Sequence, residues 1–331
     1  MRATQTTTFR SLQSFLDKTS DRMNTLTMQV ATGKRLNRAS DDPTAISPIL
    51  SAKTQLLSAD RYILTMSSGL DKVQNTDGYL ANAEEVMQRT KELAINGVNS
   101  SLSAADKATL AQEVALLKDQ LLATANAQVG GNYLFSGYAI KTAPFIENPD
   151  FDPARPPHSI SNPPDPSVDN PPVLYQGDAG KLNLEVGTNE QLEVAIDGGR
   201  LFLGLEDADG SGRYEADETT VGYDAFLQLA ALEYNLRNDD SVAINVQLDD
   251  LDASADQFRK YRSILGTVGK RLETSMDRME TIKIDQKSIL SRYEDVDLVA
   301  AITSLQQQEA SFEAALNVTS RVSELTILKY L

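Results

Sequence analysis

Residues 49–73 read ILSAKTQLLSADRYILTMSSGLDKV. Small and apolar side chains recur here at alternating steps of three and four residues, which places them along one side of an α-helix. The positions are Ile49, Ala52, Leu56, Ala59, Ile63, Met66, Leu70 and Val73. The seam is unbroken, so the pattern predicts a long helix that packs on another helix as in a coiled coil.

Similar seams lie on both sides of this stretch. The first comprises Phe9, Leu12, Leu16, Thr19, Met23, Leu26 and Val30, with polar Thr19 as its only break. Another comprises Leu251, Ala255, Phe258, Arg262, Leu265, Gly269, Leu272, Met276 and Met279, and Arg262 and Gly269 interrupt it. The last comprises Val299, Ile302, Leu305, Phe312, Leu316, Val322, Leu325 and Leu328. Further helices are expected at about 77–97 and 103–128, and the polar stretch 286–297 is interpreted as a joint.

The middle of the chain has a different composition. Ten of the twelve prolines fall between residues 144 and 172, which cannot be helical. Residues 141–250 hold 22 Asp and Glu against 6 Lys and Arg, whereas the rest of the chain is balanced. Alternating apolar residues at 182–186 and 192–196, separated by a turn at 187–189, predict a strand pair. A second turn at 197–199 precedes a third apolar run at 201–203, and a helix is expected at about 223–237.

Together these patterns predict a mainly α protein. Its N- and C-terminal arms form an antiparallel coiled coil or helical bundle, into which a small, mostly β (α+β) domain is inserted. The expected segments are a polymerisation helix at 1–40, the first part of the bundle with a terminal β-hairpin at 41–146, an acidic outward-facing insert at 147–240, a returning helix at 241–292 and a second polymerisation helix at 293–331. The outermost stripes have too few partners within one chain, so we expect both ends to be disordered or mobile until neighbouring subunits cover them.

Composition excludes several classes of function. The chain has no Cys and a single His, and it contains neither a Walker loop, a dinucleotide-binding glycine pattern nor a zinc-binding HExxH motif, so we expect no enzyme. It has no basic block for nucleic acid and no run of eighteen apolar residues for a membrane span. The polar N-terminus lacks the apolar core of a cleaved signal peptide.

One segment of the insert has the spacing of a calcium-binding loop. In DADGSGRYEADE at 207–218, Asp207, Asp209 and Ser211 match the first three oxygen ligands of an EF-hand loop, and Gly212 matches its turn. The remaining ligands would be the carbonyl of Arg213, Glu215 through a water, and Glu218. We expect a structural Ca²⁺ site without a full helix–loop–helix. The alternative is an acidic, Gly-containing surface loop.

Five short motifs in the two arms resemble those of the flagellin family. They are TGKRL at 32–36 with ASDDP at 39–43, QRTKELA at 88–94 with NG at 96–97, NYLFSG at 132–137 with PF at 144–145, GKRL at 269–272, and the terminal residues 325–331. The Asp-Asp-Pro form and the terminus are similar to the hook–filament junction proteins of that family. The resemblance covers about 1–146 and 245–331.

The resemblance implies a structural axial protein of the bacterial flagellum. Such a subunit would join hook to filament and adapt their mechanics, with itself, the hook-side junction protein and flagellin as partners. It would be extracellular, exported without a cleaved signal through the flagellar type III channel, with an export chaperone on its C-terminal helix. A filament flagellin is the alternative within the family. From a different class, the insert could be a calcium-binding or adhesive surface module displayed on this scaffold.

Overall fold

The structure is a computed structural model, and it describes residues 2–99, 102–154, 171–207 and 222–327. The chain divides into two compact units. One comprises Met1–Asp60 and Met279–Leu331, and the other comprises Arg61–Arg278. Most of the described chain is helical, which confirms the predicted fold class of long terminal helices with small antiparallel strand pairs between them.

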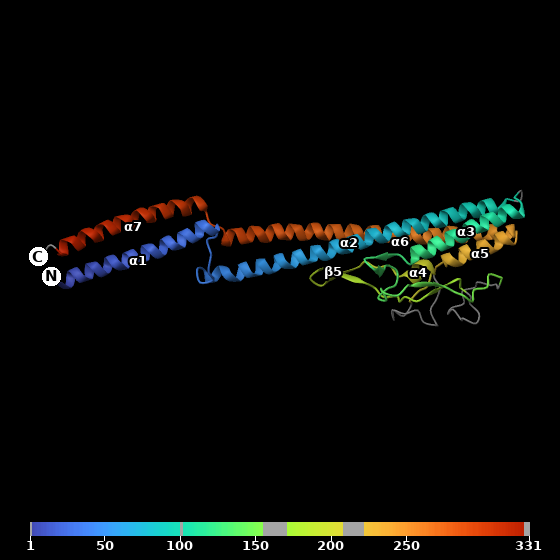
Figure 1. Cartoon of the computed structure of the whole chain (residues 1–331), viewed down its shortest axis with the longest axis horizontal. Helices are drawn as coiled ribbons and strands as arrows, with labels where there is room; N and C mark the ends of the chain where they lie inside the picture. The colour runs from blue at the N-terminus through green and yellow to red at the C-terminus, as the bar shows by residue number, and fades with distance from the viewer. Residues whose placement is uncertain (1, 100–101, 155–170, 208–221, 328–331) are drawn as a thin grey trace. The chain divides into compact units, whose positions relative to one another are not determined.

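The first unit contains the two terminal helices, α1 (Arg2–Thr32) and α7 (Leu298–Ile327), which run side by side in opposite directions (Figure 1). Gly33 follows α1 with a positive φ of 69°, and its N–H bonds the carbonyl of Gln29 at 2.9 Å. Glycine adopts this left-handed conformation without strain, so the glycine of the TGKRL motif ends the helix.

The long helices α2 (Pro43–Val98) and α6 (Ser241–Glu294) form the antiparallel seam that the sequence predicts. None of the eight seam positions at 49–73 is exposed, and Leu251, Phe258, Leu265 and Leu272 are buried on α6. The helix expected at 77–97 is not separate, because α2 continues through it. The predicted joint at 286–297 was too long: α6 continues to Glu294, whose side chain is buried, and only residues 295–297 interrupt the helices.

Two shorter helices pack on each other in the second unit, α3 (Ala104–Ala125) and α5 (Ala225–Arg237). The predicted capping box is present, since the Ser103 side chain accepts from the Asp106 N–H while the Asp106 carboxylate accepts from the Ser103 N–H. The Lys107 ammonium is almost fully buried between α3 and the turn before α6, where it contacts Asp239 and donates to the Ser241 hydroxyl at 2.8 Å.

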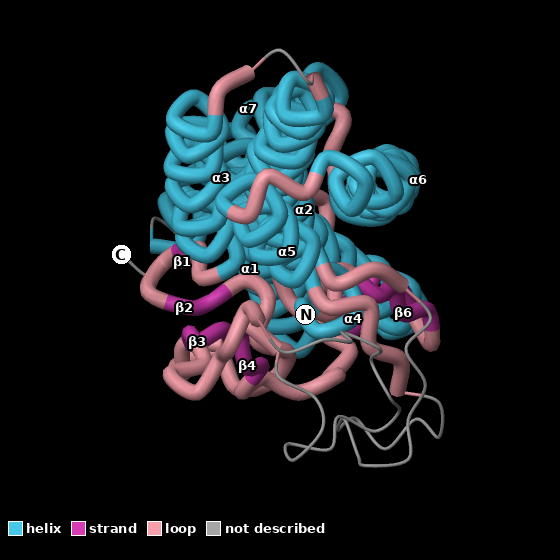
Figure 2. Tube along the Cα trace, turned by 90° about the vertical axis from the view of Figure 1, so that its right-hand side faces the viewer, coloured by secondary structure: helices cyan, strands magenta, loops and turns pink. Residues whose placement is uncertain are grey.

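The six described strands form three antiparallel pairs, shown in magenta in Figure 2. They are β1 (Gln128–Val129) with β2 (Asn132–Tyr133), β3 (Phe145–Glu147) with β4 (Val173–Tyr175), and β5 (Asn183–Gly187) with β6 (Glu190–Glu193). The β5–β6 hairpin confirms the strand pair expected around the turn at 187–189.

The turn expected at 197–199 and the start of the third apolar run belong to one short helix. The Asp197 side chain accepts from the Gly199 N–H at 2.9 Å and so caps the short helix α4 (Gly198–Phe202). That helix delivers Phe202 to the centre of an aromatic core. The ring of Phe202 lies 5.2 Å from those of Phe135 and Phe145, 5.4 Å from Phe258 and 6.0 Å from Phe226.

Candidate assembly surface

The face on which α7 packs against α1 consists mainly of small and polar residues. Most of its buried or half-buried positions follow a heptad rhythm, namely Ala301, Leu305, Gln308, Phe312, Ala315 and Thr319, and Ser311 is half-buried as well. Among the α1 side chains whose burial the structure describes, the most buried is Thr19, which is 2% exposed and donates its hydroxyl hydrogen bond to the Phe15 carbonyl at 2.7 Å. The polar interruption of the predicted seam therefore lies at its best-covered point.

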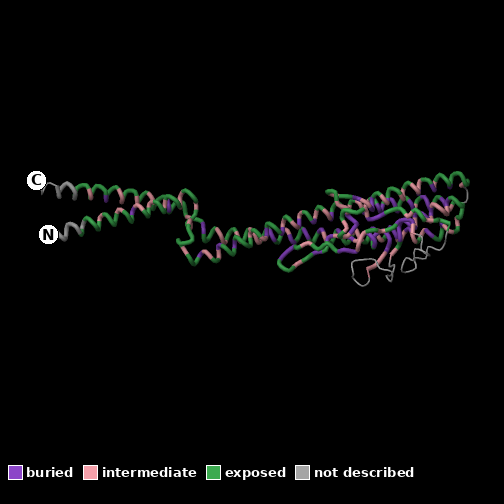
Figure 3. The backbone as a smooth tube through the Cα atoms, turned by 60° about the horizontal axis from the view of Figure 1, so that its bottom comes forward, coloured by how far each residue is buried: buried purple, intermediate pink, exposed green. Residues whose placement is uncertain are grey.

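Large apolar side chains remain on the outside of this helical pair. On α7 they are Leu298, Val299, Ile302, Leu316 and Val318, and on α1 they are Phe9, Phe15 and Met28. Val299 is 77% exposed and Phe15 is 51% exposed. Figure 3 shows the consequence, because both helices are largely green, with few buried residues along them. Exposed apolar residues repeated along both helices are typical of surfaces that bind other proteins.

The predicted stripe of α7 was therefore only half right. Leu305 and Phe312 belong to the face that α1 covers, but Val299, Ile302 and Leu316 point away from it. The side chains of Val322 and Leu325, and the whole of Leu328, lie outside the described residues. Sequence periodicity had merged two adjacent faces, because Ala301 and Ala315 contribute little hydrophobicity although they are the buried positions.

The segment that follows α1 is fastened to the segment between α6 and α7. Lys34 pairs with Asp295 in an isolated antiparallel bridge, the Arg35 N–H donates to the Glu294 carbonyl at 2.6 Å, and the Val296 N–H donates to the Gly33 carbonyl at 3.1 Å. The motifs TGKRL and ASDDP, which resemble the flagellin family, lie on this connection between α1 and α2. The Asp42 carboxylate caps α2 by accepting from Thr44 N–H at 3.1 Å.

The Glu294 carboxylate lies at the centre of this joint. Its side chain is 11% exposed, and it accepts from Lys34 Nζ at 3.1 Å and lies 2.5 Å from Lys53 Nζ. Burial acts to raise the pKa of Glu294, but the bonds from Lys53 and Lys34 outweigh it, so the pKa is lowered. Sequence analysis missed this residue, because an acid in a polar stretch gives no signal of its partners.

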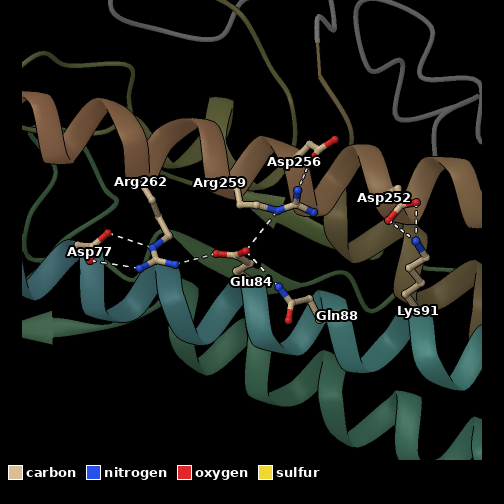
Figure 4. A network of polar contacts seen from close by, with 8 residues as sticks. All are labelled: Asp77, Glu84, Gln88, Lys91, Asp252, Asp256, Arg259 and Arg262. Carbon is tan, nitrogen blue, oxygen red and sulfur yellow. Dashed lines mark hydrogen bonds and ion pairs between the residues drawn. The ribbon is translucent and has the colours of Figure 1, made fainter.

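A second polar network crosses the α2–α6 seam (Figure 4). Arg262 occupies a seam position, and its guanidinium donates to Asp77 at 3.0 Å and to Glu84 at 2.7 Å. Glu84, itself buried, also accepts from Arg259 at 3.2 Å and from Gln88 at 3.1 Å. The bonds to Asp77 and Glu84 raise the pKa of Arg262. A charged residue at a seam position was the sequence signal for this network.

Residues of the acidic insert hold the NYLFSG motif at 132–137 in place. The Asp178 carboxylate accepts from the Tyr138 and Gly180 N–H groups, both at 2.8 Å, and the hydroxyl of half-buried Tyr175 donates to the Phe135 carbonyl at 3.0 Å. A Cβ on Gly137 would lie 2.0 Å from the Asp178 carboxylate, so only glycine fits there.

The predicted calcium loop is described only at its first residue. Asp207 is half-buried after α4, and Asp209, Ser211, Arg213, Glu215 and Glu218 lie outside the described residues. Among the residues that the structure does describe, no group of three or more acidic or His side chains could hold a metal ion. The described helices include none that is both long and apolar enough to cross a membrane.

Two family models match the two arms of the chain. The bacterial flagellin N-terminal helical region matches residues 5–140, and the bacterial flagellin C-terminal helical region matches residues 248–331. Between the two matched regions lie β3 to β6, α4, α5 and the start of α6. The matched residues include α1, α2, α3 and α7, so the family covers both the terminal helical pair and most of the bundle.

Relatives in sequence point to the same family, and solved structures share the fold. Flagellar hook-associated protein 3 of Escherichia coli is 26% identical over 91% of this chain and 90% of its own length, and flagellin of Bacillus subtilis is 21% identical over 87% and 84%. The flagellar junction protein FlgL of Legionella pneumophila, at 17% identity, has a TM-score of 0.57 over 75% of this chain and all of its own. FlgL of Xanthomonas campestris, at 18% identity, has a TM-score of 0.56 over 72% of this chain. From matched models in both arms and relatives that align over most of its length, we conclude that this chain belongs to the flagellin family of structural proteins of the bacterial flagellum.

Proposed function

We propose that this chain is the subunit that joins the flagellar hook to the filament and adapts their mechanics. The observation that carries the proposal is the row of exposed apolar side chains on α1 and α7, which one chain leaves without cover. Burying a large aliphatic side chain contributes about 1.5–3 kcal/mol. Neighbouring axial subunits would therefore gain most of their binding free energy from these two helices. The full-length similarity to hook-associated protein 3 supports the junction role.

The partners of such a subunit are further copies of this chain, the hook-side junction protein and flagellin. The exposed face of α7 would need cover before assembly as well, and an export chaperone on that helix would supply it. In this proposal the protein is exported without a cleaved signal and works outside the cell, as a structural part that catalyses no reaction.

Deleting the gene tests the junction role. Cells that lack the chain should keep their hooks and release flagellin into the medium, and the full-length gene should restore filaments. Electron microscopy of the cells and immunoblotting of the medium measure both results. Mutant cells with attached filaments of normal length would contradict the proposal.

Filament flagellin is the second candidate, because flagellin of Bacillus subtilis also aligns over most of this chain. The two roles differ in what the purified protein does. A junction subunit should stay monomeric and bind hook tips, whereas a flagellin should form long filaments when seeded. Electron microscopy after incubation with isolated hooks separates them.

We further propose that residues 207–218 bind a structural Ca²⁺ ion. The order of oxygen-bearing residues around Gly212 supports this, and extracellular calcium would supply the ion. Calorimetric titration of the full chain with CaCl₂ should show binding that Asp209→Ala abolishes. Asp249→Ala, which removes an exposed acid on α6, is the control and should bind as wild type. The absence of heat, with no change in melting temperature, would reduce the loop to an acidic surface segment.

A further inference from the structure

We propose that Glu294 is an ionic latch: it holds the two chain connections of the terminal helices together, and salt loosens it. This inference goes beyond a role in assembly, because it concerns the mechanics of a single chain. Its relevance to hook and filament rests on the proposed function, whereas the latch itself can be measured in the monomer.

The first observation is the asymmetry of the ion pairs at Glu294. The carboxylate is nearly buried, with 11% of the side chain exposed, but Lys34 and Lys53 are 48% and 47% exposed. A buried carboxylate is unfavourable unless cations and hydrogen-bond donors satisfy it. The two lysines come from different segments, one from the connection at 33–42 and the other from α2. Glu294 therefore joins the end of α6 to two parts of the N-terminal arm that are distant from it in sequence.

The second observation is how little else fastens the crossing. The antiparallel contact between the two connections is a single bridge, Lys34 with Asp295, flanked by the backbone bonds of Arg35 and Val296. The Arg35 guanidinium adds one bond to the Tyr293 carbonyl at 3.0 Å. So short a ladder is not stable by itself in water. The two ion pairs of Glu294 add to these few bonds, and they are the part of the joint that salt can screen.

The consequence concerns α1 and α7. Each joins its neighbouring long helix through one short connection, residues 33–42 or residues 295–297, and both pass through the latch. With Glu294 engaged, the terminal pair should hold one orientation relative to the start of α2. Because both lysines are half exposed, salt should screen the pairing and free the connections.

Spin labels can measure this orientation, because the chain has no cysteine of its own. Lys18→Cys on α1 and Ser47→Cys on α2 place the labels at exposed positions of the same compact unit. Pulsed electron paramagnetic resonance then gives the distribution of distances between them. In wild type it should be narrow at about 0.05 M NaCl and at least about twofold broader at about 1 M, where the Debye length falls to roughly 3 Å. In Glu294→Gln it should be broad at both salt concentrations.

Two further variants complete the test. Asp285→Asn removes an exposed carboxylate from the same helix and should leave the wild-type distribution unchanged. Lys53→Gln removes one donor but leaves the buried acid and Lys34 in place, and should broaden the distribution in part. Circular dichroism confirms that helix content is retained, and if Glu294→Gln loses helix, Lys53→Gln decides the question.

A wild-type distribution that is broad at low salt, or wild-type widths in Glu294→Gln and Lys53→Gln with helix retained, would overturn the latch. Neither result depends on whether the chain joins hook to filament. Conversely, failure of the gene-deletion test would leave these distance distributions unaffected.

Discussion

Asp224 shows at the residue scale how one side chain can both start a helix and oppose folding. Its carboxylate accepts from the Leu227 N–H at 3.0 Å and caps α5, yet the residue is only 5% exposed. Burial raises the pKa of Asp224 from 3.8 to about 7, because the charged form loses its hydration and the cap bonds compensate only in part.

The raised pKa makes a pH-dependent prediction for Asp224→Asn. The folded state holds the proton more tightly than the unfolded state, so this group contributes stability that is complete below pH 3.8 and is lost as pH rises through about 7. Asparagine keeps the cap and does not titrate. Relative to wild type, the variant should therefore gain stability from pH 5 to pH 8, at most about 1.4 kcal/mol for each pH unit below 7.

Urea unfolding at several pH values measures the difference. The exposed Asp249→Asn is the control and should follow wild type at each pH. A difference between Asp224→Asn and wild type that stays constant with pH would show that Asp224 does not titrate in this range.

At the scale of elements, the α2–α6 pair depends on a polar device as well as on its seam. Arg262 replaces an apolar residue of the seam and lies between Asp77 and Glu84, which are one heptad apart on α2. Farther along, a Cβ on Gly269 would make an ordinary van der Waals contact with Val73 at 3.6 Å, so this break in the seam leaves room for a small side chain. A shift of one heptad would leave Arg262 beside only one of the two acids, so the arginine favours the observed register.

Replacing Arg262 tests that role. Arg262→Met keeps the length of the side chain but leaves Asp77 without its ion pair and Glu84 with one fewer donor. We expect the free energy of unfolding to fall by about 1–2 kcal/mol, less than for a fully buried pair because the Arg262 side chain is 35% exposed.

Arg259→Met is the matched variant, since Arg259 contacts the same Glu84 but is 50% exposed and lies off the seam. It should cost less, and chemical denaturation of both variants provides the comparison. Equal losses, or a gain for Arg262→Met, would mean that the arginine does not hold the register.

At the scale of the whole molecule, the outer face of α7 should matter little for the stability of one chain and much for its assembly with others. Val299 and Ile302 contribute little to the fold of one chain, because 77% and 42% of their surfaces stay exposed. If neighbouring subunits cover them, both residues contribute to binding. Mutations there should separate folding from function.

The double variant Val299→Ser, Ile302→Ser should bind hook tips at least tenfold more weakly, because the loss of even one buried aliphatic side chain exceeds 1.4 kcal/mol. Its melting temperature should match that of wild type. Gln306→Ser, exposed on the same helix, is the control. Quantitative binding to isolated hooks measures the effect, and unchanged binding by the double variant would remove this face from the assembly surface.

The sequence by itself was enough to predict the long helices, because their buried side chains repeat with the period of the helix. Seam positions from Ile49 to Val73 and from Leu251 to Met279 identified the antiparallel pair, and the hairpin at 183–193 followed from strand alternation and a turn. The motifs that resemble those of flagellins indicated the family, and the family models confirmed it. The domain boundaries, the mobility of the ends and the calcium loop remain predictions.

The tertiary structure decided what depends on contacts between distant residues. Periodicity could not say which of two adjacent faces of α7 meets α1, because alanine and threonine carry too little hydrophobicity to mark a buried face. It could not find the latch, because Lys34, Lys53 and Glu294 come together only when the chain has folded back on itself. It gave a turn and an apolar run where α4 lies, because five residues are too few to show a helical period and the helix depends on its Asp197 cap. Local periodicity shows that one side of a helix is buried, whereas these features depend on which distant residues pack against it.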